Sequence, residues 1–208
     1  MNNFDDILLT AFGKGAPMLA EEIISLFPDI TRIAVYQNIE KSIAKGFLAR
    51  YSRGVYFIPI QGRFGVVPLS AEAVVERKYI SNGESVFGYY SGLTLENRAG
   101  LSPQVPAVLE ITTNAASKRV RSLGPAGGWK DVVIRKPRCE VTSENVEALK
   151  FLDAVTELSP MQLEFAELSS LKKLARKAGR KCVLECAAFY PAKTSKRLVE
   201  SEAIGVFA

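Results

Sequence analysis

The chain contains no histidine among its 208 residues and only three cysteines. Histidine is the commonest general base and the commonest metal ligand, so its absence removes the usual serine and cysteine hydrolase arrangements and most zinc sites. Cys139, Cys182 and Cys186 are too few, and odd in number, for a disulfide framework, which favours reduced thiols. We interpret Cys182 and Cys186 as small buried apolar thiols, because two thiolates without histidine fall short of a structural zinc set.

Long apolar runs are also missing. No stretch approaches the roughly 20 apolar residues that a membrane span needs, and the start, MNNFDDILLTAF, has two acids and too short an apolar run for a signal peptide. We therefore expect a cytoplasmic protein that does not bind membranes.

Magnesium-dependent nucleases and nucleotidyltransferases gather two or three carboxylates, but no Asp-x-Asp occurs. We therefore expect that the protein is not an enzyme and that it has no catalytic residue, metal or cofactor. Glu110 is the single acid that we regard as a candidate for such chemistry.

The composition is that of a globular protein, with 48% hydrophobic and 24% charged residues. A chain of this length can form one domain or two without disulfide or metal staples. The net charge of +5 favours a polyanionic partner. The basic residues are concentrated in three stretches, 32–53, 118–138 and 172–181, which contain few acids or none.

The stretch from Thr31 to Pro59 has the pattern of a helix followed by a hairpin. Helical periodicity over 31–45 ends at Gly46, and short strands are expected at 47–51 and 55–58. Two amphipathic helices precede this stretch, the first at the start of the chain and the second opening near a proline. This order predicts a winged helix-turn-helix, a DNA-reading module, over residues 1–62.

A helical projection assigns the two sides of the third helix. Val35, Tyr36, Ile39 and Ile43 fall on the packed side, and Ala34, Gln37, Asn38, Lys41 and Lys45 fall on the opposite side, which carries no acid. Amides suit bidentate contact with adenine, while lysines suit phosphates or guanine. The predicted DNA-binding residues, including those of the wing, are Thr31, Arg32, Gln37, Asn38, Lys41, Lys45, Arg50 and Arg53. An ordinary solvated helix face and surface hairpin is the alternative.

Residues 61–68 are rich in glycine and lack periodicity, which predicts a boundary before a second domain at 68–208. The elements expected there are helices at 70–80, 88–99, 142–157, 159–179, 180–189 and 193–199, and strands at 108–113, 119–123 and 132–136. The strands predict a small, mostly antiparallel sheet, so the whole chain is expected to have an α+β fold. A second basic surface is predicted along this sheet, formed by Lys118, Arg119, Arg121, Arg135 and Lys136.

Two further patterns in this region are open to more than one interpretation. Tyr89, Tyr90, Asn97 and Gln104 could form a contact surface, but a tightly packed structural helix explains them as well. The loop GPAGGWK lacks the Gly-Lys-Ser/Thr ending and the following helix of a nucleotide-binding loop. We interpret it as the tip of a hairpin.

Three runs resemble one protein family: VYQNIEKSIAKGFLARYSRGVYFIP, YYSGLTLENRAGLSPQVPAVLEITTN and VTSENVEALKFLDAV. The sequence is similar to the AbiEi-type antitoxins of bacterial type IV toxin-antitoxin systems over residues 31 to about 157. The motifs more specific to this family are Gly92-Leu93, Gly100-Leu101 and Gln104-Val105-Pro106, whereas the helix and hairpin are common to many winged helices.

The resemblance implies an N-terminal winged helix, a C-terminal α/β antitoxin domain and repression of its own operon. Its implied partners are double-stranded operator DNA and a nucleotidyltransferase toxin, which a type IV antitoxin need not bind stably. Monomer and weak dimer are both compatible with the sequence, as is cooperative binding to inverted repeats. The alternative is a winged-helix regulator without a toxin, whose C-terminal domain binds a ligand or a second copy of the chain.

Overall fold

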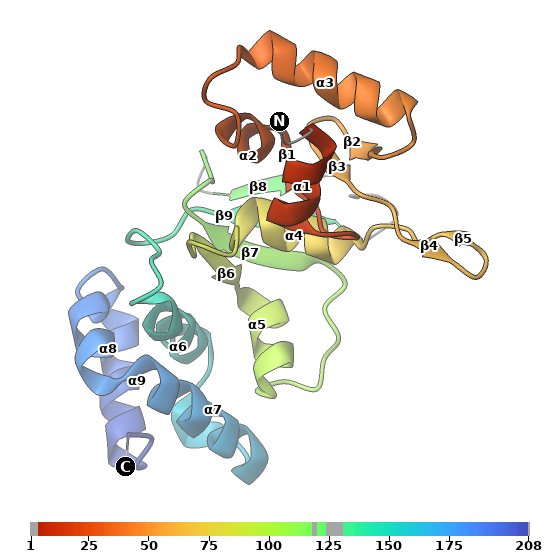
Figure 1. Cartoon of the computed structure of the whole chain (residues 1–208). Coiled ribbons are helices and arrows are strands. Elements are labelled where there is room, and N and C mark those ends of the chain that lie inside the picture. The colour runs from red at the N-terminus through yellow and green to blue at the C-terminus, as the bar shows by residue number, and fades with distance from the viewer. Residues whose placement is uncertain (1–3, 118–119, 124–130, 208) are drawn as a thin grey trace. The chain divides into compact units, whose positions relative to one another are not determined.

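The computed structural model describes residues 4–117, 120–123 and 131–207. They divide into two compact units, and the division falls between Lys78 and Tyr79. Helices and strands occur in both units (Figure 1), so the chain has the α+β fold that the sequence predicts. Within the described ranges, no helix is both long enough and apolar enough to cross a lipid bilayer.

The N-terminal unit contains the predicted three helices and hairpin. Its helices are α1 (Phe4–Phe12), α2 (Ala20–Ser25) and α3 (Arg32–Ala44), followed by strands β2 (Ala49–Ser52) and β3 (Val55–Phe57). The Thr31 hydroxyl caps α3 by accepting a hydrogen bond from the Ala34 amide at 3.3 Å, and Gly46, at φ +74°, follows its end. Local chemistry therefore sets both ends of this helix.

The second helix begins later than the sequence indicates. Met18–Leu19 forms a strand, β1, that pairs antiparallel with β3, so the sheet order is β1-β3-β2. The buried Met18 side chain joins Leu8, Ile23 and Ile39 in the core under the sheet. Burial of these apolar side chains, at about 25 cal/mol per Å², stabilises the packing of the helices on the hairpin. The element order and sheet order are those of a winged helix.

Helix α4 (Ala71–Tyr79) extends the N-terminal unit beyond the expected boundary. Ser70 caps it as predicted, by accepting from the Ala73 amide at 3.4 Å. Leu69 and Val74 pack against Val55 and Phe57 of the hairpin. The division after Lys78 thus lies later than the predicted boundary at residues 62–68, because the apolar face of α4 is buried on β3. Residues 61–68 instead hold a small hairpin of β4 (Gln61–Gly62) and β5 (Gly65–Val66).

The C-terminal unit contains a four-stranded sheet, one strand more than predicted. Its strands are β6 (Gly88–Tyr90), β7 (Leu109–Thr113), β8 (Val120–Leu123) and β9 (Val132–Arg135), in the order β6-β7-β9-β8. The β7–β9 pair is parallel and the two other pairs are antiparallel, so the sheet is mostly antiparallel. The predicted single helix from Gly88 is wrong: residues 88–90 form β6 and only Gly92–Ala99 are helical, as α5.

Helix α6 (Val146–Glu157) is the centre of the second core. Phe151, Leu152 and Val155 are fully buried, and the helix packs against α7 (Phe165–Ala178), α8 (Arg180–Ala187) and α9 (Ala192–Ala203), as Figure 1 shows. The predicted helix start at Ser159 is wrong. Pro160–Gln162 forms one 3-10 turn, η1, and α7 begins after Glu164, whose amide donates to Glu167 Oε2 at 3.0 Å.

Candidate functional site

The solvent-facing side of α3 is the first candidate site. Val35 and Ile39 are fully buried, as predicted, whereas Tyr36 is 37% exposed. Gln37 and Lys41 are exposed and Asn38 is half-buried. The α3 face therefore comprises Ile33, Tyr36, Gln37, Glu40, Lys41 and Ala44. It differs from the predicted face because Ala34 and Asn38 are half-buried, and because Tyr36, predicted for the packed side, and the acid Glu40 both lie outside.

Three of the predicted DNA-binding cations already have acidic neighbours. Arg32 Nη2 lies 2.6 Å from Glu21 Oε1, and Lys45 Nζ lies 4.0 Å from Asp5 Oδ2. Arg50 Nη2 donates to Glu40 Oε1. The Arg32 and Arg50 pairs are exposed and contribute only about 0–1 kcal/mol each, so phosphates can replace their acids. The Lys45 pair differs, because Asp5 is buried. Arg50 and Glu40 belong to different elements, so their spacing in the sequence does not predict that they pair.

A hollow of about 730 Å³ lies beside the α3 face in the N-terminal unit. Tyr36 of α3, Arg50 and Tyr56 of the hairpin, and Arg53 at its turn line it. Lys78 adds a further cation and Glu21 adds one acid. Among the side chains that the structure describes, Gln37, Lys41 and Arg53 have no hydrogen-bond or ion-pair partner. The hollow and the α3 face thus combine the unpaired cations Arg53 and Lys41 with the exposed amide of Gln37.

The predicted second basic surface is only partly within the described residues. Lys118 and Arg119 lie outside them, as does the loop GPAGGWK, and the Arg121 side chain is likewise not described. Arg135 is exposed and also forms an ion pair: its Nε and Nη2 donate to Glu110 Oε2 at 3.1 and 2.5 Å. Lys136 remains exposed beside it.

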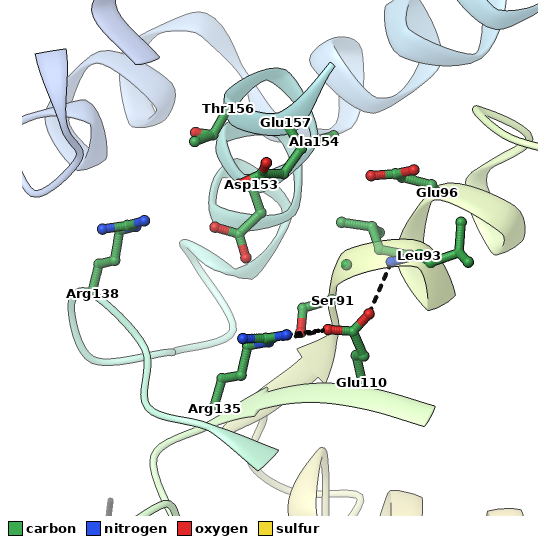
Figure 2. Close-up of a pocket in the computed structure, with 12 residues that line it drawn as sticks. Ser91, Leu93, Glu96, Glu110, Arg135, Arg138, Asp153, Ala154, Thr156 and Glu157 are labelled. Atoms are coloured by element: carbon green, nitrogen blue, oxygen red, sulfur yellow. Dashed lines mark hydrogen bonds and ion pairs between the residues drawn. The ribbon is translucent and has the colours of Figure 1, made fainter. Parts of the chain in front are cut away.

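Glu110 and Arg135 belong to a pocket of about 490 Å³ in the C-terminal unit, here named the carboxylate pocket. Its polar lining consists of Ser91, Glu96, Glu110, Arg135, Arg138, Asp153, Thr156 and Glu157 (Figure 2). The Leu93 amide in the first turn of α5 donates to Glu110 Oε1 at 3.3 Å. The positive end of the α5 dipole and the Arg135 guanidinium therefore hold the Glu110 carboxylate from two sides.

Ser91 is an unsatisfied polar residue in this pocket. It is 2% exposed, and its Oγ has no hydrogen-bond partner in the described part of the chain. Its amide bonds to the Glu110 carbonyl at 2.9 Å, which places it beside that residue, and Figure 2 shows its hydroxyl directed toward Glu110 and Arg135. An unsatisfied buried hydroxyl costs about 1–3 kcal/mol. Such a group is informative because most buried hydroxyls are satisfied.

Asp153 of α6 also lines the pocket, and two tyrosines hold it. Tyr89 Oη donates to Asp153 Oδ2 and Tyr190 Oη donates to Oδ1, both at 2.9 Å. Burial raises the pKa of Asp153, although these two hydroxyls and Arg138 favour its charged form. Burial and the Asp153 charge raise the pKa of both tyrosines. Tyr89 is 2% exposed and so forms no contact surface.

The acidic side of the pocket is poorly compensated. Burial, and then the charges of Glu157 and Glu110, raises the pKa of Glu96 above its ordinary value of 4.5. Among the described residues, no cation pairs with Glu96, while Glu157 has only Lys193 at 3.9 Å. These carboxylates come from α5, β7 and α6. Because these carboxylates are far apart in the sequence, the sequence pattern indicates only Glu110 as a candidate.

An adjoining basic hollow of about 450 Å³ shares Arg135, Arg138 and Asp153 with the carboxylate pocket. Lys136, Thr112 and Phe189 are among its other lining residues. The Arg138 guanidinium lies 5.0 Å from the centre of the Tyr190 ring, and none of the described acids lies within ion-pair distance of it. Two neighbouring hollows of opposite charge thus meet at Asp153.

The three cysteines lie near one another and are all unpaired thiols. Cys186 is buried, as the sequence predicts, whereas Cys182, for which burial was also predicted, is only half-buried. Cys139 is half-buried against the same core. Burial, and then the neighbouring Cys182 and Cys139, raises the pKa of Cys186 to about 12. Across the described ranges, no three His, Cys, Asp or Glu side chains are arranged so that they could hold a metal ion.

Comparisons with known proteins add no identification. No protein-family model matches the chain, and a search of curated proteins gives no match. The two candidate sites are therefore interpreted from their own geometry and from the motifs in the sequence.

Proposed function

We propose that the protein is a DNA-binding transcriptional regulator that represses its own operon. The observation that carries this proposal is the exposed α3 face beside a hollow that contains the cations Arg50, Arg53 and Lys78. In helix-turn-helix proteins the recognition helix enters the major groove, and flanking cations bind phosphates. α3 is 13 residues long and joins the hairpin directly, as this docking requires.

Gln37 and Lys41 have distinct roles in this proposal. The exposed Gln37 amide reads one adenine by donating to N7 and accepting from N6, while Lys41 neutralises a phosphate or contacts guanine. Arg53, at the hairpin turn, reaches an adjacent phosphate or the minor groove. Arg32 and Arg50 exchange Glu21 and Glu40 for phosphates.

A binding titration on the DNA upstream of its own gene tests this proposal. We expect nanomolar binding to that DNA, weaker binding to a shuffled sequence of equal length, and an affinity that falls steeply with salt. Binding to both sequences with equal affinity would contradict a sequence-specific regulator. No binding to either would contradict DNA binding altogether.

We propose further that the regulator is the antitoxin of a type IV pair and counteracts a nucleotidyltransferase toxin. This part rests on the family resemblance of the three quoted runs, including Gly92-Leu93 and Gln104-Val105-Pro106. The C-terminal unit is assigned the antitoxic action, without a stable complex with the toxin. The basic residues of 118–138 contact DNA or the toxin's RNA target.

Co-expression with the product of the neighbouring gene tests the antitoxin assignment. If that gene encodes a nucleotidyltransferase that arrests growth, the chain should restore growth, and replacement of Lys118, Arg119 and Arg121 by alanine should weaken repression or neutralisation. A neighbour of another kind, or unrelieved toxicity, would leave the second candidate: a regulator without a toxin. The carboxylate pocket, with its unsatisfied Ser91, specifically favours that candidate, since a pocket of this kind suits an effector.

A further inference from the structure

We infer that the carboxylate pocket and the adjoining basic hollow together bind a small zwitterion, with its amino group at Glu96 and Glu157 and its acidic group at Arg138 and Lys136. This inference goes beyond the proposed function and does not depend on DNA binding. The ligand class is an ω-amino acid, a molecule with an ammonium group at one end and a carboxylate at the other.

The amino end is assigned by the unbalanced negative charge. Glu96 is half-buried, faces the charges of Glu157 and Glu110, and has no cationic partner among the described residues. Glu110 is already paired with Arg135, and the Asp153 carboxylate accepts hydrogen bonds from two tyrosine hydroxyls. An ammonium group beside Glu96 therefore compensates the charge that the chain leaves uncompensated.

The acidic end is assigned by the cations of the basic hollow. Arg138 and Lys136 line it, and in the described part of the chain neither has a carboxylate within ion-pair distance. Figure 2 shows Arg138 and Glu96 on opposite sides of the pocket, with Asp153 and Ser91 between them. A ligand that spans the pocket therefore needs opposite charges at its two ends, and an arginine side chain is suited to a carboxylate.

Ser91 is independent support for an occupant. Ser91 lines the pocket and is 2% exposed, and its buried hydroxyl has no partner in the described residues. A bound polar molecule can supply the missing hydrogen bond. Since the hydroxyl lies beside the Glu110–Arg135 pair, we expect that pair to shift when the ligand binds.

Calorimetric titration of the whole chain with three five-carbon compounds tests the inference. 5-Aminopentanoate carries both charges, cadaverine carries two ammonium groups and glutarate carries two carboxylates. We expect the zwitterion to bind at least roughly tenfold more tightly than either of the others, since each end then has a charged partner. A series from 4-aminobutanoate to 6-aminohexanoate finds the preferred length.

Variants distinguish the pocket from other binding surfaces. Glu96→Gln and Arg138→Gln should each weaken binding of the zwitterion roughly tenfold, whereas the matched surface variants Glu185→Gln and Arg176→Gln should not change it. Ser91→Ala should weaken binding without lowering the melting temperature of the ligand-free protein, because it removes an unsatisfied group. Absence of heat with the whole series, equal binding of cadaverine or glutarate, or unchanged affinity in Glu96→Gln and Arg138→Gln would overturn the inference.

Discussion

Gly92 lies against the carboxylate of Glu110 so closely that a Cβ at residue 92 would be 2.5 Å from Glu110 Oε1. Its φ of +54° also lies in the left-handed region that favours glycine. Both requirements meet at the N-terminus of α5, where the Leu93 amide binds the same carboxylate. The Gly92-Leu93 motif therefore has a structural reason: it admits a side-chain carboxylate to a helix N-terminus.

Gly92→Ala should lower the free energy of unfolding by about 1–3 kcal/mol, because it combines an unfavourable φ with a steric clash. Gly179→Ala is the matched control, since Gly179 has φ +71° and open space around its missing Cβ. Urea denaturation should show a larger loss for Gly92→Ala than for the control. Equal losses would mean that Glu110 moves aside without cost.

If α3 binds DNA as proposed, Lys41→Ala and Gln37→Ala should affect that binding differently. Loss of the proposed phosphate contact should weaken binding to all sequences, roughly fivefold, and reduce the slope of log affinity against log salt by about 0.9. Loss of the amide should relax preference at one base pair. Titration of specific and shuffled DNA at several salt concentrations measures both effects, with the exposed Lys173→Ala as control. Indistinguishable effects of the two variants would contradict the assigned roles.

Under the proposed function, Glu40→Gln should strengthen DNA binding. The substitution removes a negative charge from the α3 face and releases Arg50, which is now paired with Glu40. We expect roughly threefold tighter binding to any DNA at low salt, and a smaller gain at high salt because exposed charges are screened. Glu76→Gln, an exposed acid on α4, is the matched control. Weaker binding by Glu40→Gln would indicate that the Arg50–Glu40 pair positions α3.

Glu96→Gln should change stability in a pH-dependent manner. The folded chain binds the Glu96 proton more tightly than the unfolded chain, so this group's contribution is fully present below its ordinary pKa of 4.5 and is lost as pH rises through the higher folded pKa. The variant should therefore be more stable than the wild type at neutral pH, by less than about 1 kcal/mol, and equal to it at about pH 4. Urea denaturation at both pH values, beside Glu185→Gln, measures the difference.

Cys186 should react slowly with thiol reagents. A pKa of about 12, against an ordinary 9.0, reduces the thiolate fraction at neutral pH by roughly a thousandfold. Timed reaction with a chromogenic disulfide, in the native and the urea-unfolded chain, measures this protection.

The stability of the chain should also depend on pH through Cys186. Since the folded state favours the neutral thiol, the contribution of Cys186 to the free energy of unfolding is fully present below pH about 9 and falls as pH rises toward 12. Cys186→Ala should make that fall shallower, and rapid native-state labelling of Cys186 would contradict the buried assignment.

Local sequence signals are sufficient to predict several of the elements. The Thr31 hydroxyl and Gly46 mark the ends of α3, and Ser70 caps α4, because helix ends are satisfied by groups within a few residues. Apolar periodicity also determined that Val35 and Ile39 are buried. These features required no knowledge of distant parts of the chain.

Other strands and charge pairs depend on partners that are distant in the sequence, so they become apparent only in the folded chain. Residues 88–90 become β6 because β7, more than 20 residues later, offers free backbone groups. Glu110 meets Arg135 across the parallel β7–β9 pair, and Tyr89 meets Asp153 across 64 residues. The carboxylate pocket exists only where these segments converge, so no local pattern of spacing could indicate it.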